Sequence, residues 1–178
     1  MDLLRKIEKP KQGEYPAYAI MYIKLVPDDG LLLKHLKDGF EDVKKFILSL
    51  PEEKLLYRYA SNKWTIKEIL VHIIDDERIY AYRALCFARN EKTALPGFEQ
   101  DDYVTFSNAN DRTIENILNE YEAVRYATIA LYQGLDDAAL LREGMANNNK
   151  ATVRALGYHI AGHELHHMNI IEEKYLGK

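Results

Sequence analysis

The sequence predicts an all-α protein built as a four-helix bundle, and three observations support this. Four segments of about 20 residues carry apolar residues at spacings of three and four, which is the periodicity of one helix face. No stretch alternates convincingly over the length of a strand, and no internal repeat is visible. The chain has 178 residues, 47% of them hydrophobic, which suffices for one domain with a substantial core spanning residues 1–178. A bundle is the default architecture for four such helices.

Residues 1–29 are predicted to form an irregular arm that wraps the bundle. Prolines and glycines interrupt this segment, and proline both removes a backbone donor and blocks regular helix. The interrupting residues are Pro10, Gly13, Pro16 and Pro27. Tyrosines at positions 15, 18 and 22 indicate that the arm is packed rather than loose.

The first two helices have recognisable ends. The first covers about residues 31–50, because its apolar positions share one face and Pro51 follows. The second begins after Thr65, which has Glu68 three residues on, the spacing of a capping box. Its apolar pattern continues to about residue 90.

The second half of the chain begins with a long loop, predicted over residues 91–112. A connection of about 20 residues is unusual in a compact domain and is often functional. Its residues 93–110, with Phe98, Tyr103 and Asn110, are a candidate lid, or its aromatic side chains simply plug the end of the bundle. The third helix begins near Thr113, with Tyr121, Val124 and Thr128 among its core positions. The last helix is capped by Thr152 and extends to about residue 175.

Composition excludes several classes of function. The 24 basic and 28 acidic residues give a net charge of −4, which argues against nucleic-acid binding because that normally requires a basic surface. A single cysteine, Cys86, excludes an internal disulfide framework and is typical of a reducing compartment. No apolar run approaches the length of a membrane span or signal peptide. We therefore expect a cytoplasmic protein without a membrane partner.

Histidines occupy positions where the last helix should be apolar. His163 and His167 lie on its core seam and, being four residues apart, have Cβ atoms about 6 Å from each other. His72 lies at the edge of the apolar stripe of the second helix. A lone histidine on such a face is more often a hydrogen-bonded core residue than a ligand, but burying two unsatisfied imidazoles is costly. Three histidines from two facing helices would bind a metal ion and leave an open coordination position, as in catalytic sites.

Two other metal motifs are weaker interpretations. Residues 163–167 match H-E-x-x-H, the zincin protease motif, but Glu164 is about 100° from His163 around a helix, and no strand is predicted to align a substrate. Glu164 and His167 also form the E-x-x-H motif of di-iron bundles. That site needs a second such motif, and Glu68 is four residues before His72 rather than three.

Two segments carry a resemblance to a known family. Residues 63–78 begin with Lys63-Trp64-Thr65 and contain His72, and residues 162–167 contain the pattern H-x-x-H-H. Together with residues 82–85 and 95–103, they resemble the DinB-like superfamily and its YfiT-type branch. The likeness covers nearly the whole chain from about residue 14.

The resemblance implies an up-down-down-up four-helix bundle with a divalent metal, zinc or nickel, on His72, His163 and His167. It implies either a metal-dependent hydrolase or a transferase that attaches a low-molecular-weight thiol, such as bacillithiol or mycothiol, to an electrophile. One relative is a maleylpyruvate isomerase. A metal held by three neutral histidines is a Lewis acid that can activate water or a thiol. A homodimer is also expected. The alternative is a non-catalytic metal-binding bundle that serves in a stress response.

Carboxylates near the three histidines are candidates for the chemistry. Asp76 lies one turn after His72 and is the first choice for a base or for orienting a ligand, and Glu164 is the second. Either could instead be a solvated helix carboxylate. Arg83 lies further along the same face and could hold an anionic substrate group or pair with an acidic residue. His159 and His166 are left without an assigned role.

Overall fold

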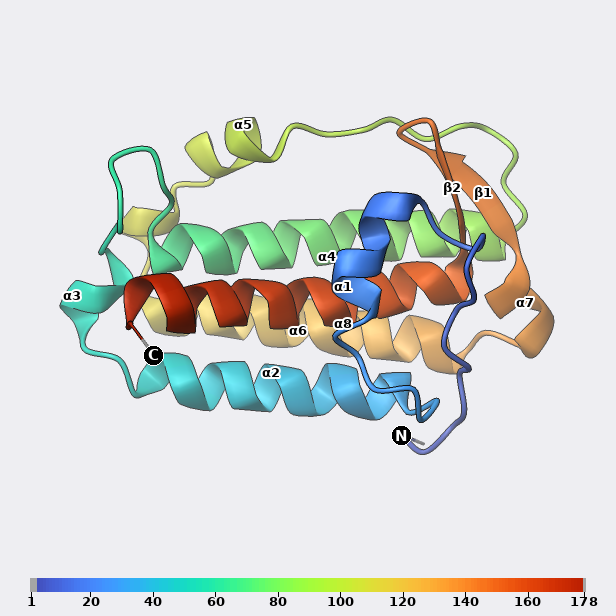
Figure 1. The fold of residues 1–178 in the computed structure, drawn as a ribbon, viewed down its shortest axis with the longest axis horizontal. Coiled ribbons are helices and arrows are strands. Elements are labelled where there is room, and N and C mark those ends of the chain that lie inside the picture. Colours follow the sequence, from blue (N-terminus) through green and yellow to red (C-terminus); the bar gives the residue numbers. More distant parts are fainter. Residues whose placement is uncertain (1–2, 178) are drawn as a thin grey trace.

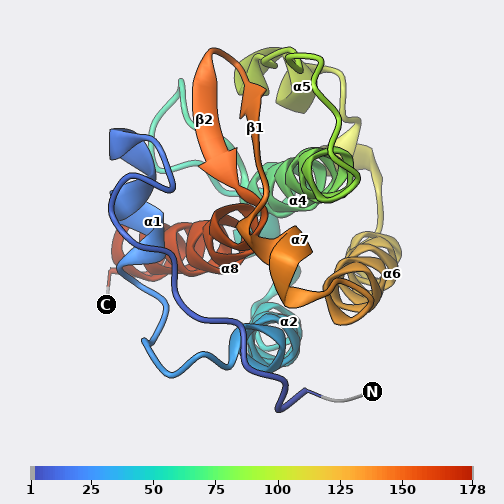
Figure 2. The same ribbon diagram turned by 90° about the vertical axis from the view of Figure 1, so that its right-hand side faces the viewer.

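The computed structural model describes residues 3–177, in which four long helices form a bundle (Figure 1). These are α2 (Leu32–Leu48), α4 (Ile66–Ala88), α6 (Ile114–Gln133) and α8 (Val153–Ile170). Seen end-on, they surround a common core (Figure 2). In Figure 1, α2 and α8 run from right to left, whereas α4 and α6 run from left to right. The connection between α4 and α6 must therefore return along the bundle, which explains its length.

The predicted starts of three helices are confirmed by their caps. Thr65 accepts a hydrogen bond from the backbone N–H of Glu68, whose carboxylate accepts from the N–H of Thr65, so the capping box is complete. Thr113 and Thr152 accept from the N–H groups three residues ahead in the same way. The last helical segment extends to Tyr175 as predicted, although α8 itself ends at Ile170 and a π-helix, η3 (Ile171–Tyr175), continues it.

The prediction that the arm and the long loop are irregular throughout was wrong. The arm contains the short elements η1 (Ala17–Ala19) and α1 (Ile20–Ile23), and the loop contains α5 (Gln100–Thr105) and η2 (Ala109–Asp111). Each has six residues or fewer. Such elements have too few turns to show a periodic apolar pattern, and their helical form depends on packing against the bundle. Two more short helices, α3 (Glu52–Leu55) and α7 (Asp137–Leu141), lie in the other connections.

A β-hairpin, which the sequence did not predict, connects α7 to α8. Strands β1 (Glu143–Ala146) and β2 (Asn149–Thr152) pair antiparallel, and Ala146 faces Asn149 across the turn. Asn147 and Asn148 have φ of 48° and 57°, as a two-residue type I′ turn requires. Leu95 adds to the hairpin through its N–H to Met145 O (2.9 Å) and its carbonyl to Asn147 N (3.0 Å). Because each strand has only four residues, alternation alone could not reveal it.

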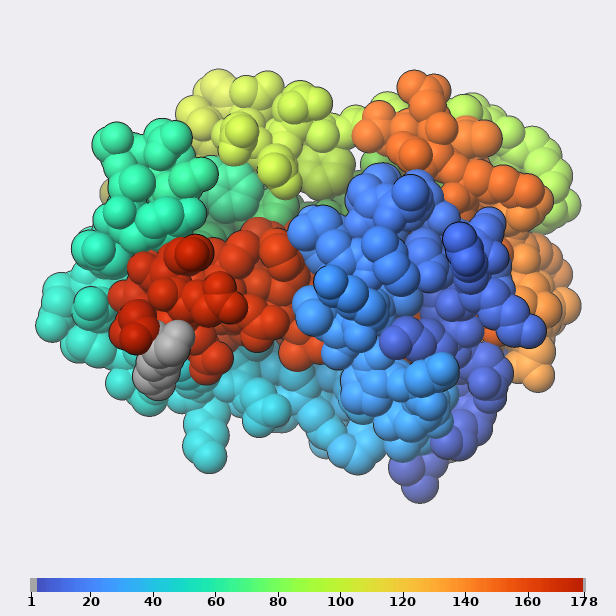
Figure 3. Space-filling model, viewed as in Figure 1, coloured from blue at the N-terminus to red at the C-terminus, as the bar shows by residue number. Residues whose placement is uncertain are grey.

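The arm packs closely against α8. Figure 3 shows the blue arm and α1 covering part of that helix. At the contact, a Cβ added to Gly162 would lie 2.2 Å from the carbonyl oxygen of Tyr22. Only glycine allows this approach.

We expect Gly162→Ala to lower the free energy of unfolding by about 1–3 kcal/mol, because the methyl group would displace α1 from α8. Gly134→Ala is the matched control, since its added Cβ would lie 3.6 Å from the nearest atom, an ordinary contact. Urea unfolding of both variants measures the difference. Equal stability of the two variants would show that the arm contributes nothing through this contact.

The apolar core is divided by a layer of buried polar side chains at mid-bundle. One apolar cluster includes Leu36, Phe87 and Tyr132, and the other includes Phe40 and Ile69. Between them, polar residues of α4, α6 and α8 are all less than 9% exposed: His72, Asp76, Glu77, Arg125, Thr128, His159, His163 and Glu164. None of the helices in residues 3–177 is long and apolar enough to cross a membrane.

Candidate metal centre

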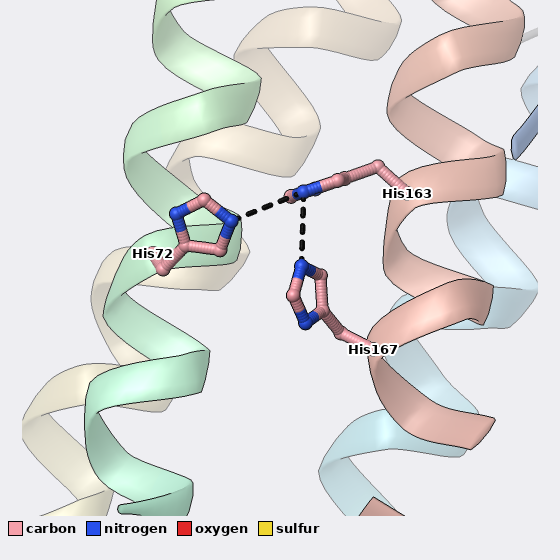
Figure 4. Close-up of side chains that lie close together, drawn as sticks. All are labelled: His72, His163 and His167. Carbon is pink, nitrogen blue, oxygen red and sulfur yellow. Dashed lines mark hydrogen bonds between the residues drawn. The ribbon is translucent and has the colours of Figure 1, made fainter. Parts of the chain in front are cut away.

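Three histidine side chains converge within the polar layer (Figure 4). His72 extends from α4 toward His163 and His167 on α8. The Nε2 atom of His163 lies 3.1 Å from that of His72 and 3.0 Å from that of His167. The structure thus brings together the three residues that the sequence suggested as ligands.

Burial keeps these histidines neutral. His72 and His163 are 3% and 4% exposed. Loss of hydration lowers the pKa of both below the ordinary value, and it lowers the pKa of His167 to about 3. At neutral pH the rings therefore carry no charge, which is the form that binds a metal ion.

The three nitrogens fit a metal ion better than they fit each other. The Nε2 atom of His163 offers either one hydrogen or one lone pair, yet two other ring nitrogens face it. Four-coordinate zinc with Zn–N distances of about 2.0–2.1 Å places its ligand nitrogens roughly 3.3 Å apart. The two separations from Nε2 of His163 are within about 0.3 Å of that value, and all three ligand atoms lie within 4.8 Å of one another. Imidazole donors suit zinc and nickel alike.

Asp76 lies behind His163, on the side away from the converging nitrogens. Its Oδ2 is 3.4 Å from Nδ1 of His163 and 3.4 Å from Nε2 of His159. Burial alone would raise the pKa of Asp76, but the neighbouring His163 and His159 more than offset it and hold the pKa below its ordinary value. An ionised carboxylate here favours a hydrogen on Nδ1 of His163 and leaves the Nε2 lone pair free. This is where the structure places the first-choice carboxylate of the sequence.

Glu164 is not brought to the three histidines. It points into a second cluster of the polar layer, where it accepts hydrogen bonds from Tyr121 and from Arg125 (Nη2–Oε2 2.8 Å). Glycine at position 39 makes room for it, because a Cβ there would lie 2.1 Å from Oε1 of Glu164. Its expected role as a base or as a residue that orients a ligand stays a prediction. Among the described residues, no contact between Glu164 and the three histidines supports it.

Arg125 and Glu77 complete this second cluster, and the sequence analysis missed both. Both side chains are 1% exposed, and Nη2 of Arg125 lies 2.9 Å from Oε2 of Glu77. The core face of α6 includes Tyr121, Arg125, Thr128 and Tyr132, whereas Val124 is only partly buried. Their i, i+4, i+7 spacing was a usable signal, but an arginine within an apolar stripe is ordinarily assigned to the surface.

Aromatic rings surround the histidine centre. Tyr22 of α1 makes edge contacts with His159, His163 and His166, and Tyr80 stacks on His159 with centroids 3.8 Å apart. His159 and His166 thus lie next to the centre. Among the described residues, neither belongs to the group of histidines whose nitrogens could hold one metal ion.

A cleft of about 390 Å³ leads to the centre on the side of His167. Its walls come from the segment before α4, from α5 and from the end of α8, which meet on the face shown in Figure 3. Lys63 and Asp101 supply charge and Trp64 supplies an apolar surface. This volume suits a small molecule. Of the expected lid, only Gln100 and Asp101 line this cleft. Phe98 and Tyr103 line a different cleft. Asn110 accepts a hydrogen bond from Thr65 and donates one to Glu68.

Fold and site together define a helical-bundle protein with a candidate three-histidine metal centre. The chain belongs to the DinB superfamily, whose family model matches residues 35–171 and so includes all three histidines. Among solved structures it is similar to YfiT from Bacillus subtilis, described as a probable metal-dependent hydrolase with an unusual four-helix bundle topology. The TM-score is 0.71, the sequence identity 14%, and 92% of each chain is covered. The search of the curated proteins found no match.

Proposed function

We propose that this protein is a divalent-metal-dependent enzyme that acts on a small molecule, as a hydrolase or as a low-molecular-weight-thiol S-transferase. One observation carries the proposal: three neutral imidazoles converge on one point, and a buried carboxylate lies behind the central one. Membership of the DinB superfamily and the likeness to YfiT support it. Zinc and nickel are the metals that we propose.

The residues of the chain have distinct roles in this proposal. His72, His163 and His167 would hold the ion, which when bound supplies a Lewis acid that lowers the pKa of water or a thiol. Asp76 keeps His163 in the tautomer that presents Nε2. The cleft beside His167 admits the substrate, and the buried surroundings of the histidines strengthen electrostatic interactions there.

Both proposed reactions rely on the same Lewis acid but differ in the nucleophile, which is water for a hydrolase and a thiol for a transferase. A hydrolase would cleave esters or amides without added thiol. A transferase would consume thiol and electrophile in equal amounts. The expected homodimer and the expected absence of a nucleic-acid partner stay predictions.

Metal analysis of protein purified without a nickel column tests the proposal directly. We expect close to one equivalent of zinc or nickel per chain, and less than about a tenth of an equivalent, with no uptake on adding either ion, would overturn it.

His72→Ala separates catalysis from a structural role for the metal. We expect activity against an ester or thiol–electrophile panel to be lost with a small change in melting temperature. A large loss of melting temperature, with no activity in the unmodified protein, would favour the non-catalytic stress-response bundle instead.

A further inference from the structure

Arg83 of α4 is a buried cation without a carboxylate partner among the described residues. Its side chain is nearly inaccessible, with the residue 6% exposed. Within residues 3–177 its one hydrogen bond runs from Nη2 to the carbonyl oxygen of Pro96 (2.9 Å). The guanidinium also lies over the rings of Tyr80 and Phe98, 5.0 and 5.9 Å from their centroids.

These contacts offset only part of the cost of burying the charge. A carbonyl and two aromatic faces supply partial negative charge, but no net charge. A guanidinium has five N–H donors, and an unpaired buried charge is costly. Arg125 in the same bundle shows the usual solution, since two carboxylates contact it. Arg83 therefore has the capacity to bind an anion that the chain itself does not supply.

Arg83 lines two cavities, and neither has an acidic residue in its walls. One is a small space of about 20 Å³ beside His159. The other is a cleft of about 270 Å³ between α4 and the connection to α5. Its walls are mostly apolar or aromatic and include Ile79, Tyr82, Leu95, Phe98 and Tyr103.

We propose that this second cleft binds a small aromatic carboxylate, with its carboxylate on Arg83 and its ring against Phe98 and Tyr103. The planar guanidinium matches a carboxylate through two parallel hydrogen bonds, and aromatic walls favour a flat apolar body. The volume limits the ligand to roughly the size of a single substituted ring.

This site is separate from the histidine centre. Arg83 is 11 residues beyond His72 on the same helix, which corresponds to roughly 16 Å along its axis. The cleft at Arg83 and the cleft at His167 share no lining residue. The proposal thus goes beyond the proposed function and does not require a metal ion.

Calorimetric titration of the protein with phenylacetate and with its neutral analogue phenylacetamide tests the proposal. We expect phenylacetate to bind at least about tenfold more tightly, because only the acid gains charge-assisted hydrogen bonds. Equal affinities, or no binding of phenylacetate, would overturn it, and neither outcome depends on a variant folding. Inorganic phosphate serves as a second probe, and its binding in preference to phenylacetate would also overturn the proposal.

Arg83→Met should weaken phenylacetate binding at least about tenfold and remove its dependence on salt. Arg154→Met is the matched control, because Arg154 is also largely buried but is paired with Glu14 and lines neither cleft. We expect that control to bind normally. Each titration is done on metal-free and on zinc-loaded protein, with the same affinity expected for both. Binding that requires zinc and survives Arg83→Met would place the acid at the histidine centre and overturn this proposal without contradicting the proposed function.

Discussion

Replacing His163 with alanine is expected to weaken zinc or nickel binding by more than about a hundredfold. His163 supplies the central nitrogen, which faces both other histidines. Loss of an outer partner of a metal ligand typically costs 10- to 100-fold, so loss of the central ligand should cost more. Metal content after purification and titration against a competing chelator give the stoichiometry and the affinity.

Two companion variants make this result specific. Asp76→Asn keeps all three ligands but removes the charge behind His163, so we expect an intermediate loss of about 10- to 100-fold. His166→Ala removes a neighbouring imidazole of α8 that lies against Tyr22 and should leave the affinity unchanged. If His166→Ala lost the metal and His163→Ala kept it, the assignment of ligands would be wrong.

Arg125→Met should lower the free energy of unfolding by about 3–5 kcal/mol, the usual cost of removing one partner from a buried ion pair. Arg125 is 1% exposed and contacts both Glu77 and Glu164. Without it, two buried carboxylates would face each other across the core. Guanidinium unfolding measures the loss, and Arg78→Met, which removes a half-exposed partner of Glu120, should cost at most about 1 kcal/mol.

The loss of stability caused by Arg125→Met should also depend on pH. Burial already raises the pKa of Glu164 above its ordinary value, and removing Arg125 would raise it further. A carboxyl whose pKa is higher in the folded state stabilises the fold below its unfolded pKa, and this contribution is lost as pH rises through the folded value. The variant should therefore lose more stability than the unmodified protein as pH rises above the ordinary pKa of glutamate. Equal pH profiles for the two proteins would show that the carboxylates of the variant are solvated.

Local signals in the sequence were sufficient for much of the fold. Thr65, Thr113 and Thr152 were predictable as caps because a cap depends on residues three positions apart. The hairpin was missed, although it is also local, because strands of four residues are too short for alternation to show. Most of the core face of α6 was predicted, but Val124 was assigned to it in place of Arg125. An isolated pattern does not reveal the two carboxylates on neighbouring helices that pair with the arginine.

The sequence by itself determined the candidate ligands. His163 and His167 share a helix face through their spacing, and His72 lies at the edge of the apolar stripe of a second helix. The resemblance to a known family points to the same three residues. The tertiary structure alone decided which carboxylate serves which cluster. Adjacent residues of a helix point about 100° apart, so His163 faces α4 and Asp76, while Glu164 faces Arg125 on α6. Periodicity defines the direction of a side chain relative to its own helix, whereas its partners and its pKa depend on how the helices pack and what they exclude from water.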